Sequence, residues 1–277
     1  MGVCKGNVGN LMQHWTLCEV VQAAAEQDLP HLHFVSTHGM APWSVPAEVQ
    51  NDAQVQARLL FDSARNRPTN ARNSFYEQVW HDIALYRGLP YPSSAAFVVQ
   101  AWGRRLSLSL CEADQFVAAE VAGWLKLSEV AEKLVRKQLH RDDWRTGLAA
   151  MLDQGDSGVC TLIEMDPMQF DHHQGMQEPG SPMLFPEDLE TIIEATEGLT
   201  GPIILQMSSY IAQNGNPHPV VEQCIAGPLH EAGFRLQGKA VANGNMISLV
   251  YARMIELWND TGTLGQRFDC WKEGLIQ

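Results

Sequence analysis

Acidic residues follow three predicted strands of the chain, at or just after the point where each strand ends: Glu112, Asp142 and Asp166. A carboxylate offers two acceptor oxygens, so Glu112 could hold both hydroxyls of a ribose, and Asp142 or Asp143 could accept from an adenine amine. The alternative role for Asp142 and Asp143 is helix capping. Asp166-Pro167 has the clearest chemistry. Burial and neighbouring groups can shift the pKa of a carboxyl at the end of a buried strand. Such a carboxylate could compensate the charge of a bound sulfonium and accept a hydrogen bond from an incoming amine. Its alternative is an ordinary Asp-Pro turn.

The elements that must position these residues alternate between helix and strand. Helices are predicted over 10–27, 93–104, 114–126, 142–152, 186–197 and 218–232, and strands over 31–36, 106–111, 134–140, 159–165 and 203–207. A hairpin is predicted from 234–242 to 246–252 around Asn243-Gly244-Asn245. This pattern predicts an α/β protein with a Rossmann-like, doubly wound sheet whose last strand is antiparallel. The apolar strand 159–165 is expected at the centre, and ligands outside the carboxyl ends of the strands.

The domain organisation follows from length and composition. The chain has 277 residues, of which 45% are hydrophobic, so residues 1–277 are expected to form one domain around one core. Residues 44–90 interrupt the alternation with two helical patterns, 49–64 and 75–86, and are predicted to be a helical insertion after the first strand. This insertion is too short for a core of its own.

Charge and cysteine content narrow the function classes. The net charge of −13 argues against a broad nucleic-acid footprint, because an acidic body repels phosphates unless its cations cluster. The six cysteines contain no Cys-x-x-Cys pair, which is typical of reduced cytoplasmic proteins and gives no reason to expect a metal site. No apolar run is long enough for a membrane span and no signal-peptide pattern is present, so a cytoplasmic chain without membrane contact is expected.

Several short segments match motifs of one enzyme family in order along the chain. Gly6-Asn7 and His14 match a G-N-x-x-D-x-x-K-H helix start, and the segment 36–42 (STHGMAP) falls on D-T-H-A-G-A-G. Residues 91–95 (YPSSA) fall on Y-P-G-S-P, 110–113 (LCEA) on T-E-L-H, 141–144 (RDDW) on A-D-G-F, and 166–169 (DPMQ) on D-P-P-Y. On these segments the chain resembles the RlmJ-type ribosomal RNA adenine-N(6) methyltransferases over roughly residues 6–252.

The resemblance implies a sheet of the class I methyltransferase type and the cofactor S-adenosylmethionine. It implies that the methionine half of the cofactor is lined by Gln13, His14, Thr37, His38 and Ser94, with Glu112 on the ribose and Asp142 on the adenine. It also implies that Asp166 and the carbonyl of Pro167 orient the target amine for in-line attack on the methyl group. Phe170 could replace the aromatic residue of the D-P-P-Y motif as the face that stacks on a flipped base.

The chain departs from the family in its working parts. Met40 and Pro42 replace glycine-turn residues and are expected to crowd the cofactor, Met168 and Gln169 replace the second proline and the aromatic residue, and Gln13 replaces a lysine. Ribosomal RNA is the partner that the resemblance implies, although the charge opposes it. Two alternatives stay open: a methyltransferase acting on a small-molecule or protein substrate, and a catalytically inactive methyltransferase-fold binding protein.

Overall fold

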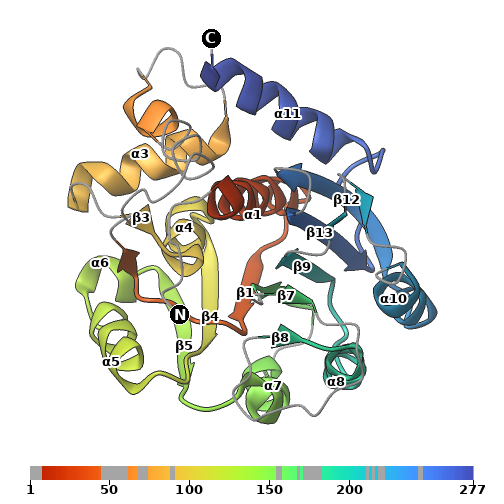
Figure 1. Cartoon of the computed structure of the whole chain (residues 1–277). Helices are drawn as coiled ribbons and strands as arrows, with labels where there is room; N and C mark the ends of the chain where they lie inside the picture. Colours follow the sequence, from red (N-terminus) through yellow and green to blue (C-terminus); the bar gives the residue numbers. More distant parts are fainter. Residues whose placement is uncertain are drawn as a thin grey trace.

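The computed structural model describes residues 8–44, 62–67, 74–87, 91–153, 158–166, 169–170, 183–209, 212–213, 216–217, 222–242 and 246–276 (Figure 1). Several predicted features lie outside these ranges: the Gly6-Asn7 motif, most of the first helical pattern of the insertion, Pro167, Met168 and the hairpin turn at 243–245.

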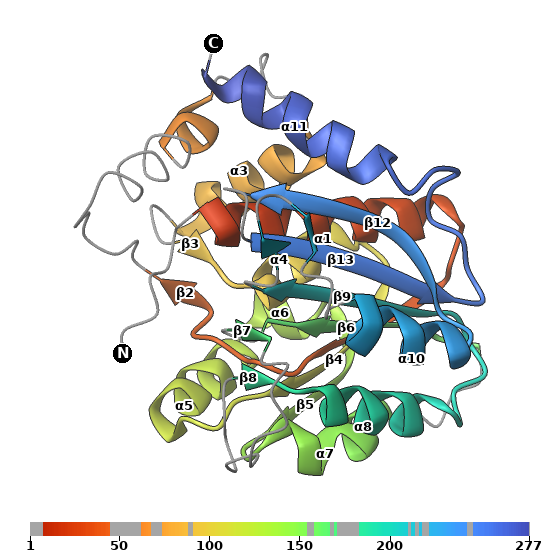
Figure 2. The same cartoon turned by 45° about the vertical axis from the view of Figure 1, so that its right-hand side comes forward.

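A seven-stranded sheet forms the centre of the molecule (Figure 2). Its strands are β1 (His31–Ser36), β4 (Arg105–Cys111), β5 (Leu134–His140), β6 (Cys160–Met165), β9 (Ile203–Ser209), β12 (Arg235–Ala242) and β13 (Met246–Arg253), in the order β12-β13-β9-β6-β1-β4-β5. Strand β13 pairs antiparallel with both β9 and β12, whereas the β6, β1 and β4 pairings are parallel. The predicted doubly wound sheet with an antiparallel last strand is confirmed, and the apolar strand β6 lies at its centre.

Helices cover both faces of the sheet (Figure 1). One face carries α1 (Val8–Glu26), α3 (Phe75–Arg87), α4 (Ser94–Ala101), α5 (Gln115–Trp124), α6 (Ser128–Ala131) and α11 (Thr263–Ile276). The other carries α7 (Trp144–Leu152), α8 (Pro186–Thr196) and α10 (Gly227–Glu231), which continues the π-helical turn Glu222–Ala226. No helix among the described residues is both long and apolar enough to cross a membrane.

Short strand pairs complete the described chain. Strand β2 (Trp43–Ser44) pairs with β3 (Tyr91–Pro92), β7 (Gln169–Phe170) with β8 (Met183–Leu184), and β10 (Ala212–Gln213) with β11 (Asn216–Pro217). The β2–β3 pair holds the two ends of the insertion together. The chain therefore enters and leaves the insertion at neighbouring points. Tyr76 on α3 packs on Phe97 of α4 and on Trp271 of α11, so the described part of the insertion shares the main core.

Capping side chains explain where α4 and α5 begin. Ser93 accepts the N–H of Ala96 at the start of α4, and Asp114 accepts two N–H groups at the start of α5. Helix α4 ends at Ala101, three residues before the predicted end, and Gly103 follows at a φ of 49°.

Helix α11 was not predicted, although its buried residues Leu264, Phe268, Trp271 and Leu275 recur at helical spacing.

Candidate functional site

The loop after β1 crosses the carboxyl edge of the sheet and packs tightly on its neighbour. The N–H of Thr37 donates to the carbonyl of Glu164 over 3.1 Å, and the N–H of Gly39 donates to the carbonyl of Cys111. A β-carbon on residue 39 would lie only 2.3 Å from that carbonyl oxygen. Only glycine therefore allows the loop to pass this close to the end of β4.

Glu112 and Asp142 lie next to each other at the ends of β4 and β5. The N–H of Glu112 donates to the carbonyl of His140 over 2.9 Å, and the thiol of Cys111 donates to the carbonyl of Asp142 over 3.0 Å. The Glu112 carboxylate accepts from the Asp114 N–H, and the exposed Asp142 carboxylate accepts from the Asp143 N–H, both over 2.8 Å. The structure therefore brings this predicted pair together.

The capping alternative applies to Asp143 and not to Asp142. Asp143 is the N-cap of α7 and accepts the N–H of Arg145 over 3.0 Å. The Arg145 guanidinium also donates two hydrogen bonds, of 2.6 and 2.8 Å, to the buried Asp188 carboxylate of α8. This ion pair ties α7 to α8, whereas the Asp142 carboxylate remains at the surface.

Asp166 follows β6, on the other side of β1 from Glu112 and Asp142. Its carboxyl is half-buried and hydrogen-bonds the side chain of Gln13. Burial and the nearby Glu164 together raise the pKa of Asp166 to about 7, against the opposing effect of the Gln13 hydrogen bond. Asp166 therefore changes its charge near neutral pH.

Glu164 is a site residue that the sequence analysis missed. It is fully buried and accepts from the Gln13 amide over 3.0 Å, from the Ser36 hydroxyl over 3.1 Å and from Ser94. Burial raises the pKa of Glu164, although these three hydrogen bonds oppose the rise. The sequence did contain a signal for Glu164, because a single acid inside an otherwise apolar strand must be paired or protonated.

His14 is buried in the core. Its Nδ1 shares a hydrogen bond with the Tyr91 hydroxyl over 2.8 Å, and its Nε2 shares one with the Ser94 hydroxyl over 3.0 Å. Burial lowers the pKa of His14 to about 3, so the imidazole is neutral. With both nitrogens occupied, His14 positions Ser94, which in turn contacts Glu164.

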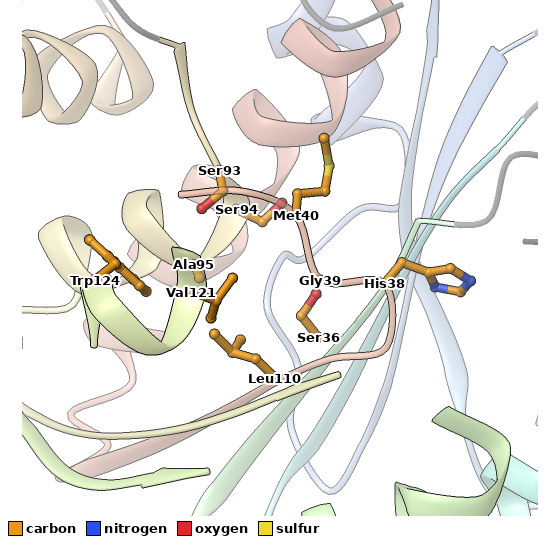
Figure 3. A pocket seen from close by; sticks show the side chains of 10 residues that line it. All are labelled: Ser36, His38, Gly39, Met40, Ser93, Ser94, Ala95, Leu110, Val121 and Trp124. Carbon is orange, nitrogen blue, oxygen red and sulfur yellow. The ribbon is translucent and has the colours of Figure 1, made fainter. Parts of the chain in front are cut away.

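His38 points away from the Ser93 and Ser94 side of the loop (Figure 3). Its Nδ1 shares a hydrogen bond of 2.7 Å with the Thr37 hydroxyl, and its ring centroid lies 6.1 Å from that of Trp144 on α7. Burial, helped by Arg145, lowers the pKa of His38 to about 4. Its Nε2 is buried without a hydrogen-bond partner in the described structure.

Met40 lines a cavity of about 10 Å³ between the β1 loop and α4 (Figure 3). This volume holds about one water molecule. The cavity lining includes Ser36, Ser94 and Trp124. A nucleoside cannot enter a space of this size, and the Met40 side chain forms part of its wall.

Phe170 is described only through its backbone, which pairs with Leu184 in the β7–β8 ribbon. Pro167, the other predicted catalytic partner of Asp166, lies outside the described residues. Of the three residues predicted to be catalytic, Asp166 is the one whose side chain the structure describes.

Comparisons with known proteins support the architecture. No family model matches the chain, and no curated protein matches its sequence. Among solved structures, the protein LPL1258 from Legionella pneumophila, of the family model DUF519, aligns with a TM-score of 0.57 and 18% identity over 90% of this chain and 86% of its own. At that identity the likeness shows the fold alone.

Two further solved structures are more distant. A SAM-dependent methyltransferase from Aquifex aeolicus aligns with a TM-score of 0.36 and 9% identity over 84% of this chain and 90% of its own. Fibrillarin from Aeropyrum pernix, with natively bound S-adenosyl-L-methionine, aligns with a TM-score of 0.36 and 11% identity over 57% of this chain and 60% of its own. At these TM-scores neither carries an argument about this chain.

The strand order itself defines the class of fold. Numbered along the chain, the seven strands of the main sheet lie in the order 3-2-1-4-5-7-6, with the seventh strand antiparallel. This is a Rossmann-like sheet of the class I methyltransferase type, as the sequence predicted.

Proposed function

We propose that the protein is an S-adenosylmethionine-dependent methyltransferase that transfers the methyl group to an amine. The observation that carries the proposal is the position of the acidic residues at the topological switch point. The chain runs from β1 outward to β4 and β5, then returns to β6 on the other side of β1. Ligands of doubly wound sheets bind outside the strand ends at this point, where Glu112, Asp142 and Asp166 lie.

The side chains at this edge fit a nucleoside that carries a positively charged tail. Glu112 and Asp142 present carboxylates at neighbouring strand ends, which suits a ribose and an adenine amine. Three buried polar atoms of the edge lack hydrogen-bond partners in the described structure: His38 Nε2, Gln13 Oε1 and Gln206 Oε1. Unsatisfied buried groups are costly, and a ligand with donors and acceptors would relieve them.

Each residue has a role in this proposal. Glu112 holds the ribose, Asp142 the adenine amine, and Gln13, Thr37 and His38 the edge beside the methionine tail, whereas His14 and Ser94 support Glu164 from behind. The bound cofactor supplies an electrophilic methyl group. Ionised Asp166 accepts hydrogen bonds from the target amine and turns its lone pair toward that methyl group.

The finer substrate proposal is an adenine amine in ribosomal RNA, supported by the motif resemblance and by one cation and one aromatic residue near this edge. Arg141 is exposed directly after β5, one residue before Asp142, whereas Arg136 and Lys137 of β5 donate to the carbonyls of Asp153 and Leu125 at the C-terminal ends of α7 and α5. Phe116 is 74% exposed at the start of α5, four residues after Glu112. Cations that reach a phosphate backbone and an aromatic face that can stack on a base are the two components of single-strand binding.

A second candidate, a methyltransferase-fold binding protein without transfer activity, is favoured by one observation. Met40 and the β1 loop leave only about 10 Å³ beside Ser36 and Ser94. A cofactor held only along the outer edge would bind without its methyl group reaching Asp166.

Calorimetry followed by a transfer assay separates these candidates. We expect S-adenosylmethionine to bind the full chain, and a Glu112→Gln variant to lose about 1–3 kcal/mol of that binding, or roughly 5–150-fold in Kd. Radiolabelled methyl transfer to unmodified ribosomal RNA, with a mixture of small amines in parallel, then identifies the acceptor class. Binding without transfer to any acceptor supports the second candidate, and the absence of binding refutes both.

A further inference from the structure

Beside Asp166 the carboxyl edge contains more hydrogen-bond acceptors than donors. Glu164 and Asp166, two residues apart at the end of β6, both hydrogen-bond the side chain of Gln13. The amide oxygen of Gln13 and that of Gln206 on β9 are buried without partners in the described structure. Gln206 donates an amide N–H to the backbone carbonyl of Gln13 over 2.9 Å.

The donors that reach this cluster are neutral. The two carboxyls receive hydrogen bonds from the amide of Gln13 and, at Glu164, from the hydroxyls of Ser36 and Ser94. Within the described ranges no lysine or arginine contacts either carboxyl. Two neighbouring carboxylates with neutral partners repel each other, so one of them retains a proton unless a cation arrives.

The other titratable groups around the pair do not supply that cation. His14 on α1 is neutral and already bonded on both nitrogens, and Tyr91 on β3 is bonded to it. His38 after β1 is also neutral, because burial lowers its pKa to about 4. The charged groups beyond these, at the start of α7, are Asp143 and Arg145, and Arg145 is paired with both Asp143 and Asp188.

We propose that Glu164 and Asp166 share one proton in the empty protein, and that the ammonium group on the ligand's tail displaces this proton when it binds one oxygen of Asp166, which leaves the second oxygen for the target amine. The inference rests on the proposed function and names the part of the edge that recognises the charged tail. An ammonium supplies three N–H donors and one positive charge, which are the two properties the cluster lacks. The two unpartnered amide oxygens provide a second observation, since they need donors and not further acceptors.

Proton release follows from the half-buried position of Asp166 at the mouth. The Asp166 pKa of about 7 means that about 0.9 protons are released per ligand at pH 6 and about 0.5 at pH 7. The released proton passes to the buffer. By linkage, ligand that binds the ionised pair should bind about fivefold more tightly at pH 7 than at pH 6.

The test is titration calorimetry on the full chain in two buffers of different ionisation enthalpy, phosphate and imidazole. S-adenosylmethionine and S-adenosylhomocysteine both carry the α-ammonium, and 5′-methylthioadenosine carries the same nucleoside and sulfur without it. We expect both ammonium ligands to release protons in the amounts given above, and methylthioadenosine to release none. All three ligands binding with equal proton release, or with none, would overturn the inference while the proposed function survives.

Two variants locate the proton. In Glu164→Gln the repulsion between the carboxyls is removed while Asp166 stays half-buried, so proton release at pH 6 should fall below the wild-type value of about 0.9. Unchanged release in this variant would overturn the shared proton. Glu19→Gln is the matched control. Glu19 is also a buried acid, but it lies on α1 and pairs with Arg267, away from this edge. If E164Q does not fold, the wild-type buffer series decides the question. If none of the three ligands binds, the proposed function and the inference both fail.

Discussion

Replacing Asp166 by asparagine should change how stability depends on pH. The native pKa of about 7 lies above the ordinary 3.8, so the folded protein holds a proton that the unfolded chain releases between pH 4 and 7. Stability from this group is therefore complete below pH 4, is lost as the pH rises from 4 to 7, and does not change further above pH 7. The difference between the two pKa values corresponds to about 4 kcal/mol, which is an upper value for a half-buried carboxyl.

Urea unfolding followed by tryptophan fluorescence at pH 5, 6, 7 and 8 measures this effect. The stability of Asp166→Asn relative to wild type should increase by roughly 1.4 kcal/mol per pH unit up to pH 7, then level off. Asp142→Asn is the control at the same edge, because it makes the same change from carboxyl to amide at an exposed side chain. Parallel curves for D166N and wild type would show that Asp166 is ionised throughout this range, and would refute the assignment of its environment.

Three further changes test other parts of the structure. Gly39→Ala places a β-carbon against the Cys111 carbonyl and should cost about 1–3 kcal/mol in thermal unfolding, whereas Gly123→Ala, in open space on α5, should stabilise by about 0.5–1 kcal/mol; equal effects would contradict the tight loop. His33, buried and neutral with its pKa lowered to about 3, should destabilise the fold as pH falls below 6.5, so His33→Gln should retain about 3 kcal/mol more of its neutral-pH stability at pH 4. An unchanged acid transition in that variant would exclude this role. Met40→Ala should enlarge the cavity beside Ser94 and tighten S-adenosylmethionine binding at least threefold by calorimetry; weaker binding would mean that Met40 contacts the ligand.

The strand ends were predictable from the sequence because their physics is local. A run of apolar residues that stops at Glu112 or Asp166 marks both a buried strand and its mouth, and parallel strands place such mouths at one edge. Capping was readable for the same reason, since Ser93 and Asp114 satisfy the N–H groups of the turn that follows them.

The directions of the side chains at that edge were not predictable. His14 and His38 were expected beside a ligand, but the rotation of α1 turns His14 into the core, and the β1 loop turns His38 toward Trp144. Glu164 was overlooked because its neighbours are apolar, and its partners Gln13 and Ser36 come from elements far away in the chain. The tight fit around Met40 depends on packing at the level of single atoms, which no residue pattern encodes.

The packing of the last described helix on the first has a consequence for biosynthesis. Trp15 of α1 stacks on Trp271 of α11 and meets Phe268 edge to face, so α1 obtains this cover from a segment that leaves the ribosome long after it. At ordinary rates of translation that delay is on the order of 10–50 s. During this time an aromatic surface of the nascent chain stays open, and a chaperone that shields it would raise the yield of folded protein.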